Sequence, residues 1–217
     1  MNTIDICAKL EETTYWVNAF RGNEVLDPEN SIAIGSAVAI SASGDLLTAA
    51  HVVTGRLPVK EEYLKDPDLT IVGRRKSGEL IKYRPSICGP AINNQYLDEP
   101  LTIDLALLHP ISHKLNVPYL EISTEPISVG TQVLMAGFPD DMELPFSFDR
   151  ILNPQNPQVG VQQTNLRIAR QLLMIKSGMI GHRSRATFSV GSLTLEGEVV
   201  YIDNELHTGA SGGPVVD

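Results

Sequence analysis

The sequence is poor in cysteine, with only Cys7 and Cys88 in 217 residues. The two lie far apart and lack the CxxC spacing of zinc and redox sites, so we expect two free thiols in a reducing compartment. This excludes a disulfide framework, but a chain of this length can bury a sizeable core without one.

Long hydrophobic runs are also missing. No apolar stretch approaches the ~20 residues that a membrane-spanning helix needs. The first residues mix Asp5, Lys9 and Glu11 into their apolar positions and so lack the unbroken hydrophobic region of a signal peptide. We therefore expect a cytoplasmic protein that does not associate with membranes.

Basic residues are fewer than acidic ones, 17 Lys and Arg against 26 Asp and Glu, which gives a net charge of −9. Because binding to phosphates is driven largely by Lys and Arg, this balance argues against a nucleic-acid partner. The sequence also has no HExxH motif and no cluster of Cys and His ligands, so we expect neither a metal nor another cofactor.

What is present is a series of short apolar segments separated by turn residues. After a short amphipathic helix around residues 4–10, pairs of these segments flank Gly-containing loops, as in β-hairpins. They indicate an all-β sandwich or pair of barrels, with one lobe in residues 1–124 and a second in 125–217. Residues 140–163 fit a long surface loop, and 164–175 fit a helix or a strand. The predicted strands include AIGSAVAIS, LLTAAHVV, DLTIVGRR, ELIKYRPSI, TIDLALLHP, ISVGTQVLMAGFP and SLTLEGEVVYI.

The most informative segment is GASGGPV, in which glycines surround Ser211. A nucleophilic serine needs an exposed hydroxyl beside backbone N–H groups that can bind a developing oxyanion, and glycines permit the tight backbone this requires. The alternative is a plain glycine-rich turn between strands.

Two further segments hold the residues that such a serine needs. LLTAAHVV contains His51, whose imidazole can exchange a proton near neutral pH. TIDLALL surrounds Asp104 with apolar residues, where a carboxylate needs a partner to offset its desolvation. Each has a structural alternative, since a lone histidine after a strand is more often structural and a backbone N–H or an arginine could pair with the aspartate. The order His, Asp, Ser is more specific than any one signal.

Together TAAHVV, IDLALL and GASGGPV resemble the three active-site motifs of trypsin-like serine proteases. The GSAVAIS and ISVGTQVLMAGFP segments are most similar to the bacterial, disulfide-poor branch that includes the HtrA-type proteases. The resemblance runs from about Ser31 to Asp217 and is weakest over residues 140–165.

The resemblance implies two antiparallel six-stranded β-barrels with the site between them. It also implies a serine endopeptidase that hydrolyses peptide bonds through an acyl-enzyme. In this assignment Ser211 is the nucleophile, His51 is the general base and then acid, and Asp104 orients the histidine. The backbone N–H groups of Gly209 and Ser211 would form the oxyanion hole.

In the family, the last strands of the second barrel follow the nucleophile, whereas only six residues follow Ser211 here. We therefore expect a second barrel that is incomplete at its C-terminus. A further C-terminal domain or a partner chain would complete this barrel. We also expect the protein to bind a protein or peptide substrate.

Two positions depart from the digestive members of the family. Those enzymes have a cysteine after the catalytic histidine and an aspartate before the serine, and the aspartate pairs with a new N-terminus during activation. Here the two positions hold Val52 and Ala210. Ala210 cannot form that ion pair, so the oxyanion loop must be ordered in another way.

Three more residues are candidates near such a site. Glu205 stands where trypsin-like enzymes place the floor of the primary specificity pocket, and an acid there would favour Lys or Arg substrates, although a solvated glutamate is the commoner arrangement. His207 and His109 are competing bases, but His207 shares its loop with Ser211 and His109 precedes a proline. The alternative function is a protease-fold binding or regulatory domain, inactive or activated only by a partner.

Overall fold

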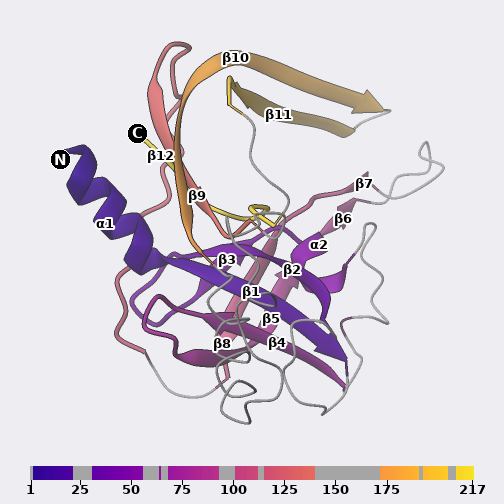
Figure 1. Ribbon diagram of the computed structural model, residues 1–217. Coiled ribbons are helices and arrows are strands. Elements are labelled where there is room, and N and C mark those ends of the chain that lie inside the picture. Colours follow the sequence, from indigo (N-terminus) through magenta and orange to yellow (C-terminus); the bar gives the residue numbers. More distant parts are fainter. Residues whose placement is uncertain are drawn as a thin grey trace, which may run out of the picture.

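The computed structural model describes residues 2–21, 31–55, 64, 68–92, 101–111, 115–139, 172–190, 193–204 and 209–217. These residues form a closed barrel, a second sheet that stays open, a two-stranded sheet and two helices (Figure 1). The predicted all-β class, with one complete and one incomplete barrel, is confirmed. None of the helices in these ranges is long and apolar enough to span a membrane.

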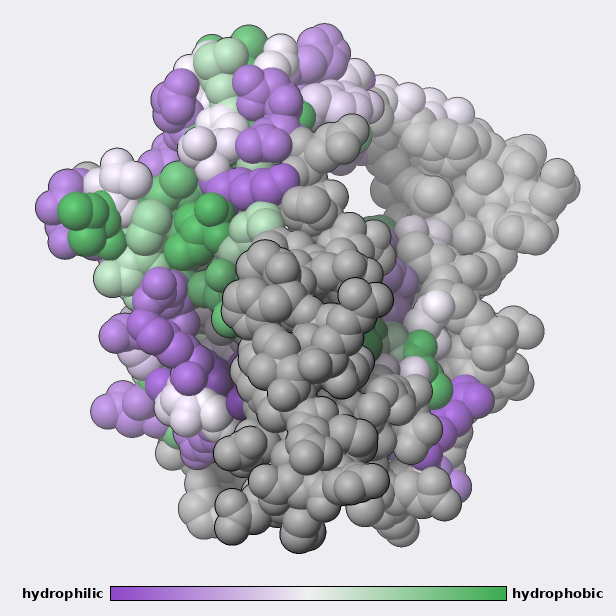
Figure 2. Space-filling model, in the orientation of Figure 1, coloured by the Kyte–Doolittle hydropathy of each residue, from purple (hydrophilic) through white to green (hydrophobic). Residues whose placement is uncertain are grey.

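The N-terminal helix α1 (Thr3–Thr13) agrees with the amphipathic pattern and leads directly into β1 (Thr14–Arg21). Asn2 caps it, because its side-chain oxygen accepts a hydrogen bond from the Asp5 N–H at 2.9 Å. Leu10 is fully buried while Ile4 is 79% exposed, so α1 packs against the fold only near its C-terminal end. Figure 2 shows hydrophobic residues gathered on the side of the molecule where α1 lies.

The first barrel closes through six antiparallel strands in the order β1-β2-β3-β8-β5-β4. Alternate residues of β1 point inward, so Tyr15, Val17 and Ala19 are fully buried in the barrel core. Closure leaves this sheet without a free edge. The other five strands are β2 (Ser31–Ala39), β3 (Leu46–Thr48), β4 (Leu69–Arg74), β5 (Leu80–Cys88) and β8 (Ala106–Pro110).

The second sheet has the strand order β11-β10-β9-β12 and is not closed within the described residues. Its long strand β10 (Met174–Val190) pairs first with β9 (Gln132–Gly137) and then with β11 (Leu193–Ile202). The hairpin of β10 and β11 reaches away from the first barrel (Figure 1). The short strand β12 (Val215–Val216) follows Ser211 and pairs with the other edge of β9.

Two expectations about the local structure around the candidate site are wrong. LLTAAHVV is not one strand, because β3 ends at Thr48 and His51–Thr54 form the short helix α2. TIDLALLHP is likewise interrupted: β7 (Leu101–Thr102) pairs with β6 (Ala91–Ile92), and β8 begins only at Ala106. Both candidate residues of the first barrel therefore lie just outside its strands.

The described residues leave some expectations open. The predicted loop over 140–163 and most of 164–175 lie outside them, although Met174 and Ile175 are strand residues of β10. The division into lobes at residues 124 and 125 stays a prediction, and it falls in the strand-free stretch 115–131.

Candidate active site

His51 and Asp104 are held together by two hydrogen bonds. Asp104 Oδ2 lies 2.7 Å from His51 Nδ1, and Asp104 Oδ1 accepts a hydrogen bond of 3.0 Å from the backbone N–H of the same histidine. That N–H is free to donate because His51 opens α2, and the first N–H groups of a helix have no partner within it. One carboxylate therefore fixes both the backbone and the ring of His51, and leaves Nε2 as the ring nitrogen available to a substrate or a serine.

The surroundings of this pair differ from the sequence expectation. The side chains of His51 and Asp104 are 38% and 36% exposed, and the neighbouring Ile103 and Leu105 are 47% and 37% exposed. The apolar composition of TIDLALL therefore does not bury the carboxylate in the described residues. The partner of Asp104 is indeed a histidine. Because the carboxylate is exposed, however, desolvation does not explain why Asp104 has this partner.

Ser211 occupies the exposed corner of a tight turn. The Gly213 N–H donates to the Ala210 carbonyl at 3.0 Å, and Gly212 has a φ of +83°, as the third residue of a type II turn requires. Gly209, just before the turn, also has a positive φ of +86°. Glycines on both sides of Ser211 thus permit a backbone that other residues rarely adopt.

This serine turn packs closely against the first barrel. A Cβ on Gly212 would lie 2.3 Å from both the Ser36 carbonyl oxygen and Thr48 Oγ1. A Cβ on Gly35 would lie 2.5 Å from the Val52 side chain and 3.1 Å from the Ser211 carbonyl oxygen. The turn therefore lies against β2 and the end of β3, beside the residue that follows His51.

The structure brings the three predicted residues to one region but does not join all of them. In the part of the chain that it describes, no hydrogen bond links the His51 ring to the Ser211 hydroxyl. Among the described residues, no hydrogen bond is donated by the backbone N–H groups of Gly209 and Ser211, and their role as an oxyanion hole stays a prediction. The catalytic roles of these residues remain predictions.

A groove of about 760 Å³ lies next to Asp104. The first barrel contributes Leu47 and Asp104 itself to its lining. Apolar side chains of the second sheet, among them Val133, Ile180 and Val215, line another part, and residues between 120 and 127 together with the end of the serine turn contribute the remainder. The groove thus connects the exposed carboxylate with the open interior of the second sheet.

The other candidates have different outcomes. His109 Nδ1 lies 2.5 Å from Asp45 and is not part of this region, so its role as a competing base finds no support in the contacts. Glu205 and His207 lie outside the described residues, and the specificity-pocket role of Glu205 stays a prediction. Val52 and Ala210 are both buried, Val52 in the core of the first barrel.

Two residues of this region were missed by the sequence analysis. Cys88 Sγ lies 3.9 Å from the Ala50 carbonyl oxygen, and burial together with the negative charge of Asp104 raises its pKa to about 11. The thiol therefore stays protonated at neutral pH and is a poor competing nucleophile. Ser36 is fully buried and binds the serine turn, and its only signal in the sequence is a small polar residue within the apolar strand GSAVAIS.

Comparison with solved structures agrees with this architecture. The HtrA-type protease AlgW with tripeptide superposes with a TM-score of 0.57 at 18% identity, covering 100% of this chain and 51% of that one. A serine endoprotease from Yersinia pestis gives 0.53 at 16% identity, covering 100% and 54%. At such identities the likeness concerns the fold alone, and the chain spans about half the length of these proteins.

Sequence comparison gives the family. No curated protein matches the chain. The family model described as a trypsin-like peptidase domain matches residues 35–217, which include the His51–Asp104 pair and the serine turn. Since that match covers most of the sequence, the chain belongs to the trypsin-like peptidase domain family.

Proposed function

We propose that the chain is a serine endopeptidase that uses Ser211, His51 and Asp104 as its catalytic triad. The observation that carries this proposal is the double contact of Asp104 with His51, 2.7 Å to the ring and 3.0 Å to the backbone N–H, beside a turn that presents a serine. A carboxylate on Nδ1 selects the tautomer in which Nε2 can accept a proton, and that is the arrangement a nucleophilic serine needs.

The reaction would follow from these positions. Ser211 Oγ attacks the carbonyl carbon of the peptide bond while its proton passes to His51 Nε2, and Asp104 stabilises the resulting imidazolium. The N–H groups of Gly209 and Ser211 bind the oxyanion. The C–N bond then breaks, His51 gives its proton to the leaving amine, and water hydrolyses the ester on Ser211 by the same proton transfers.

The substrate class would be proteins or peptides. AlgW, which has the same fold, was solved with a tripeptide, and a substrate in an extended conformation could pair with a free strand edge. We further propose that the groove beside Asp104 is filled by additional chain, either a C-terminal continuation or a partner. The largely apolar lining supports this, and so do β11 and β12, which are edge strands of the sheet within the described residues, since exposed edges are normally covered.

Labelling with a fluorophosphonate tests the proposal, because the probe bonds covalently to an activated serine. The 217-residue chain should be labelled at Ser211. Ser211→Ala should abolish labelling, and His51→Ala should abolish nearly all of it. Ser86→Ala is the matched control, since the exposed Ser86 hydroxyl lies on the first barrel, where its one hydrogen bond to a described residue is to the Leu107 carbonyl.

The same experiment addresses the alternative function. A folded but unlabelled chain would favour a binding or regulatory domain, and would contradict an active enzyme in this form. Labelling that appears only after a longer form of the protein or a partner is supplied would identify the partner-activated version. The open groove is the feature that favours this alternative.

A further inference from the structure

Ser36 of β2 makes four hydrogen bonds at the junction between the two sheets. Its hydroxyl donates to the Gly209 carbonyl at 2.9 Å and accepts from the Phe138 N–H at 2.8 Å. Its backbone N–H donates to the Ser211 carbonyl at 2.8 Å, and its carbonyl accepts from the Thr48 hydroxyl at 2.6 Å. The side chain is fully buried, so these partners are fixed without competition from bulk water.

These bonds hold the serine turn on both sides of Ala210. A hydrogen bond to the Gly209 carbonyl fixes the peptide plane between Gly209 and Ala210, and one to the Ser211 carbonyl fixes the plane between Ser211 and Gly212. Both glycines have positive φ values and wide conformational freedom, so the turn needs an external constraint to keep one shape. Ser36 supplies that constraint from the more rigid barrel.

We propose that Ser36 is a positioning residue that orders the oxyanion-binding turn. This inference rests on the proposed peptidase function. In digestive relatives an aspartate before the serine does this by an ion pair, and here Ala210 cannot. Ser36 touches no reacting atom, and it acts by fixing the peptide planes on either side of the one that carries the Ser211 N–H, which the proposed mechanism uses to bind the oxyanion.

The hydroxyl itself is the part that can be tested. Ser36→Ala leaves the strand and its backbone bonds in place but removes a donor from the Gly209 carbonyl and an acceptor from the Phe138 N–H. Both groups are buried, so the turn must shift to find new partners. Gly137 confirms how little space there is, since a Cβ there would lie 3.2 Å from Ser36 Oγ.

The experiment is fluorophosphonate labelling of the 217-residue chain, resolved into the maximal rate kinact and the apparent affinity KI. For Ser36→Ala we expect kinact to fall about 10- to 100-fold while KI changes less than about twofold, because orientation of the oxyanion donors affects the transition state. Ser36→Cys, which keeps a donor at this position, although a weaker and larger one, should recover part of the rate.

Thr13→Val is the matched control. Thr13 is also fully buried and its hydroxyl donates to the Lys9 carbonyl at 2.8 Å, far along the chain from the serine turn. It should lower the melting temperature without lowering kinact. An unchanged kinact in Ser36→Ala, or equal losses of kinact in Ser36→Ala and Thr13→Val, would overturn the inference.

A second readout separates this inference from the proposed function. Hydrogen exchange at the Phe138 amide should be faster in Ser36→Ala than in the parent chain, whether or not the protein is active. If the parent chain is not labelled, the proposed function fails, and faster exchange at Phe138 with a displaced serine turn would still establish that Ser36 holds that turn. An unchanged exchange rate at the Phe138 amide would show that the Ser36 hydroxyl does not hold the serine turn, and would overturn the inference.

Discussion

The described residues of the first barrel include two pairs of histidine and aspartate, and the contacts of the two pairs are nearly the same. His51 and Asp104 are 2.7 Å apart, and His109 and Asp45 are 2.5 Å apart, in each case from Nδ1 to a carboxylate oxygen. The histidines are also similarly exposed, 38% and 40%. The contact alone therefore does not distinguish a catalytic pair from a structural one.

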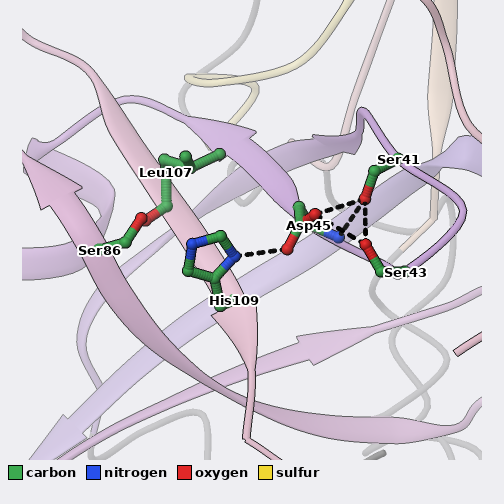
Figure 3. A network of polar contacts seen from close by, with 6 residues as sticks. All are labelled: Ser41, Ser43, Asp45, Ser86, Leu107 and His109. Carbon is green, nitrogen blue, oxygen red and sulfur yellow. Dashed lines mark hydrogen bonds and ion pairs between the residues drawn. The ribbon is translucent and has the colours of Figure 1, made fainter. Parts of the chain in front are cut away.

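The difference lies in what else each aspartate binds. Asp45 also accepts hydrogen bonds from the Ser41 and Ser43 hydroxyls, at 2.5 and 2.9 Å, in the turn after β2 (Figure 3). Partial burial acts to raise its pKa, but hydrogen bonds from Ser41, His109 and Ser43 outweigh this, and the pKa of Asp45 lies below its usual value. The two serines bind the carboxylate and not the histidine, and among the described residues no hydroxyl is hydrogen-bonded to the His109 ring.

Asp104, in contrast, uses both of its carboxylate oxygens to bind a single residue. It binds the ring and the backbone N–H of His51, whose helix lies beside the serine turn. What marks a site is thus the serine turn that lies beside the helix of His51, and not the strength of the pair.

Removing each histidine in turn should give the largest contrast. We expect His51→Ala to lower the rate of fluorophosphonate labelling by about 10⁴-fold or more, whereas His109→Ala should change it less than about threefold. Because Ser211→Ala removes the hydroxyl that the probe labels, the coupling of the two residues is measured as peptide hydrolysis, where the double variant His51→Ala with Ser211→Ala should be little worse than either alone. A comparable loss in His109→Ala would mean that the wrong pair has been assigned.

Neutral isosteres of the two aspartates should separate activity from stability. Asp104→Asn should lower the labelling rate on the order of 10³- to 10⁴-fold, because an amide no longer selects the productive tautomer of His51. Asp45→Asn should leave labelling within about threefold but lower the free energy of unfolding on the order of 1 kcal/mol, since three hydrogen bonds to a carboxylate are weakened. Urea denaturation and labelling of both variants give the two quantities. Full activity in Asp104→Asn would remove Asp104 from the mechanism.

Displacing the serine turn should leave the His51–Asp104 pair without a nearby serine to activate, and so make it resemble the His109–Asp45 pair. Gly212→Ala puts a Cβ 2.3 Å from two atoms of the first barrel, so the turn must move away, and we expect labelling to fall about 100-fold. Gly130→Ala is matched for backbone strain, because Gly130 has a φ of +89° but nothing within 4 Å of its added Cβ. It should cost only about 1 kcal/mol of stability, from its left-handed backbone. Equal labelling by the two variants would show that the close approach is unimportant.

The smallest expected effect is the pH dependence of the structural pair. Because the pKa of Asp45 is lower in the folded than in the unfolded chain, its stabilisation is fully present above the unfolded value of about 3.9. It is lost as the pH falls through the lower folded value. The difference in melting temperature between the parent chain and Asp45→Asn should therefore be larger at pH 7 than at pH 3. A difference in melting temperature that is the same at pH 7 and at pH 3 would contradict a lowered pKa of Asp45 in the folded chain.

The sequence predicted the parts of the fold and site that depend on local pattern. Alternation and turn residues indicated the strands, and the motif around Ser211 indicated a glycine-bounded turn. The exposure of Asp104 could not be predicted, because composition does not tell which side of a segment another element covers. Ser36 was missed for a similar reason, since its partner Gly209 lies 173 positions further along the chain.

The open second sheet also affects the order in which the molecule should lose its structure. His51 and Asp104 are attached to a barrel that closes on itself, whereas the serine turn leads into the short strand β12, which in the described residues is bound to β9 by two residue pairs and the hydrogen bond from the Ala136 N–H to the Pro214 carbonyl. Local opening is easiest where few contacts must break. On heating, Ser211 should therefore leave its place before the barrel melts, so labelling should disappear at a lower temperature than the near-ultraviolet signal of the buried Tyr15 and Trp16. Coincident loss of both would show that the two sheets unfold as one cooperative body.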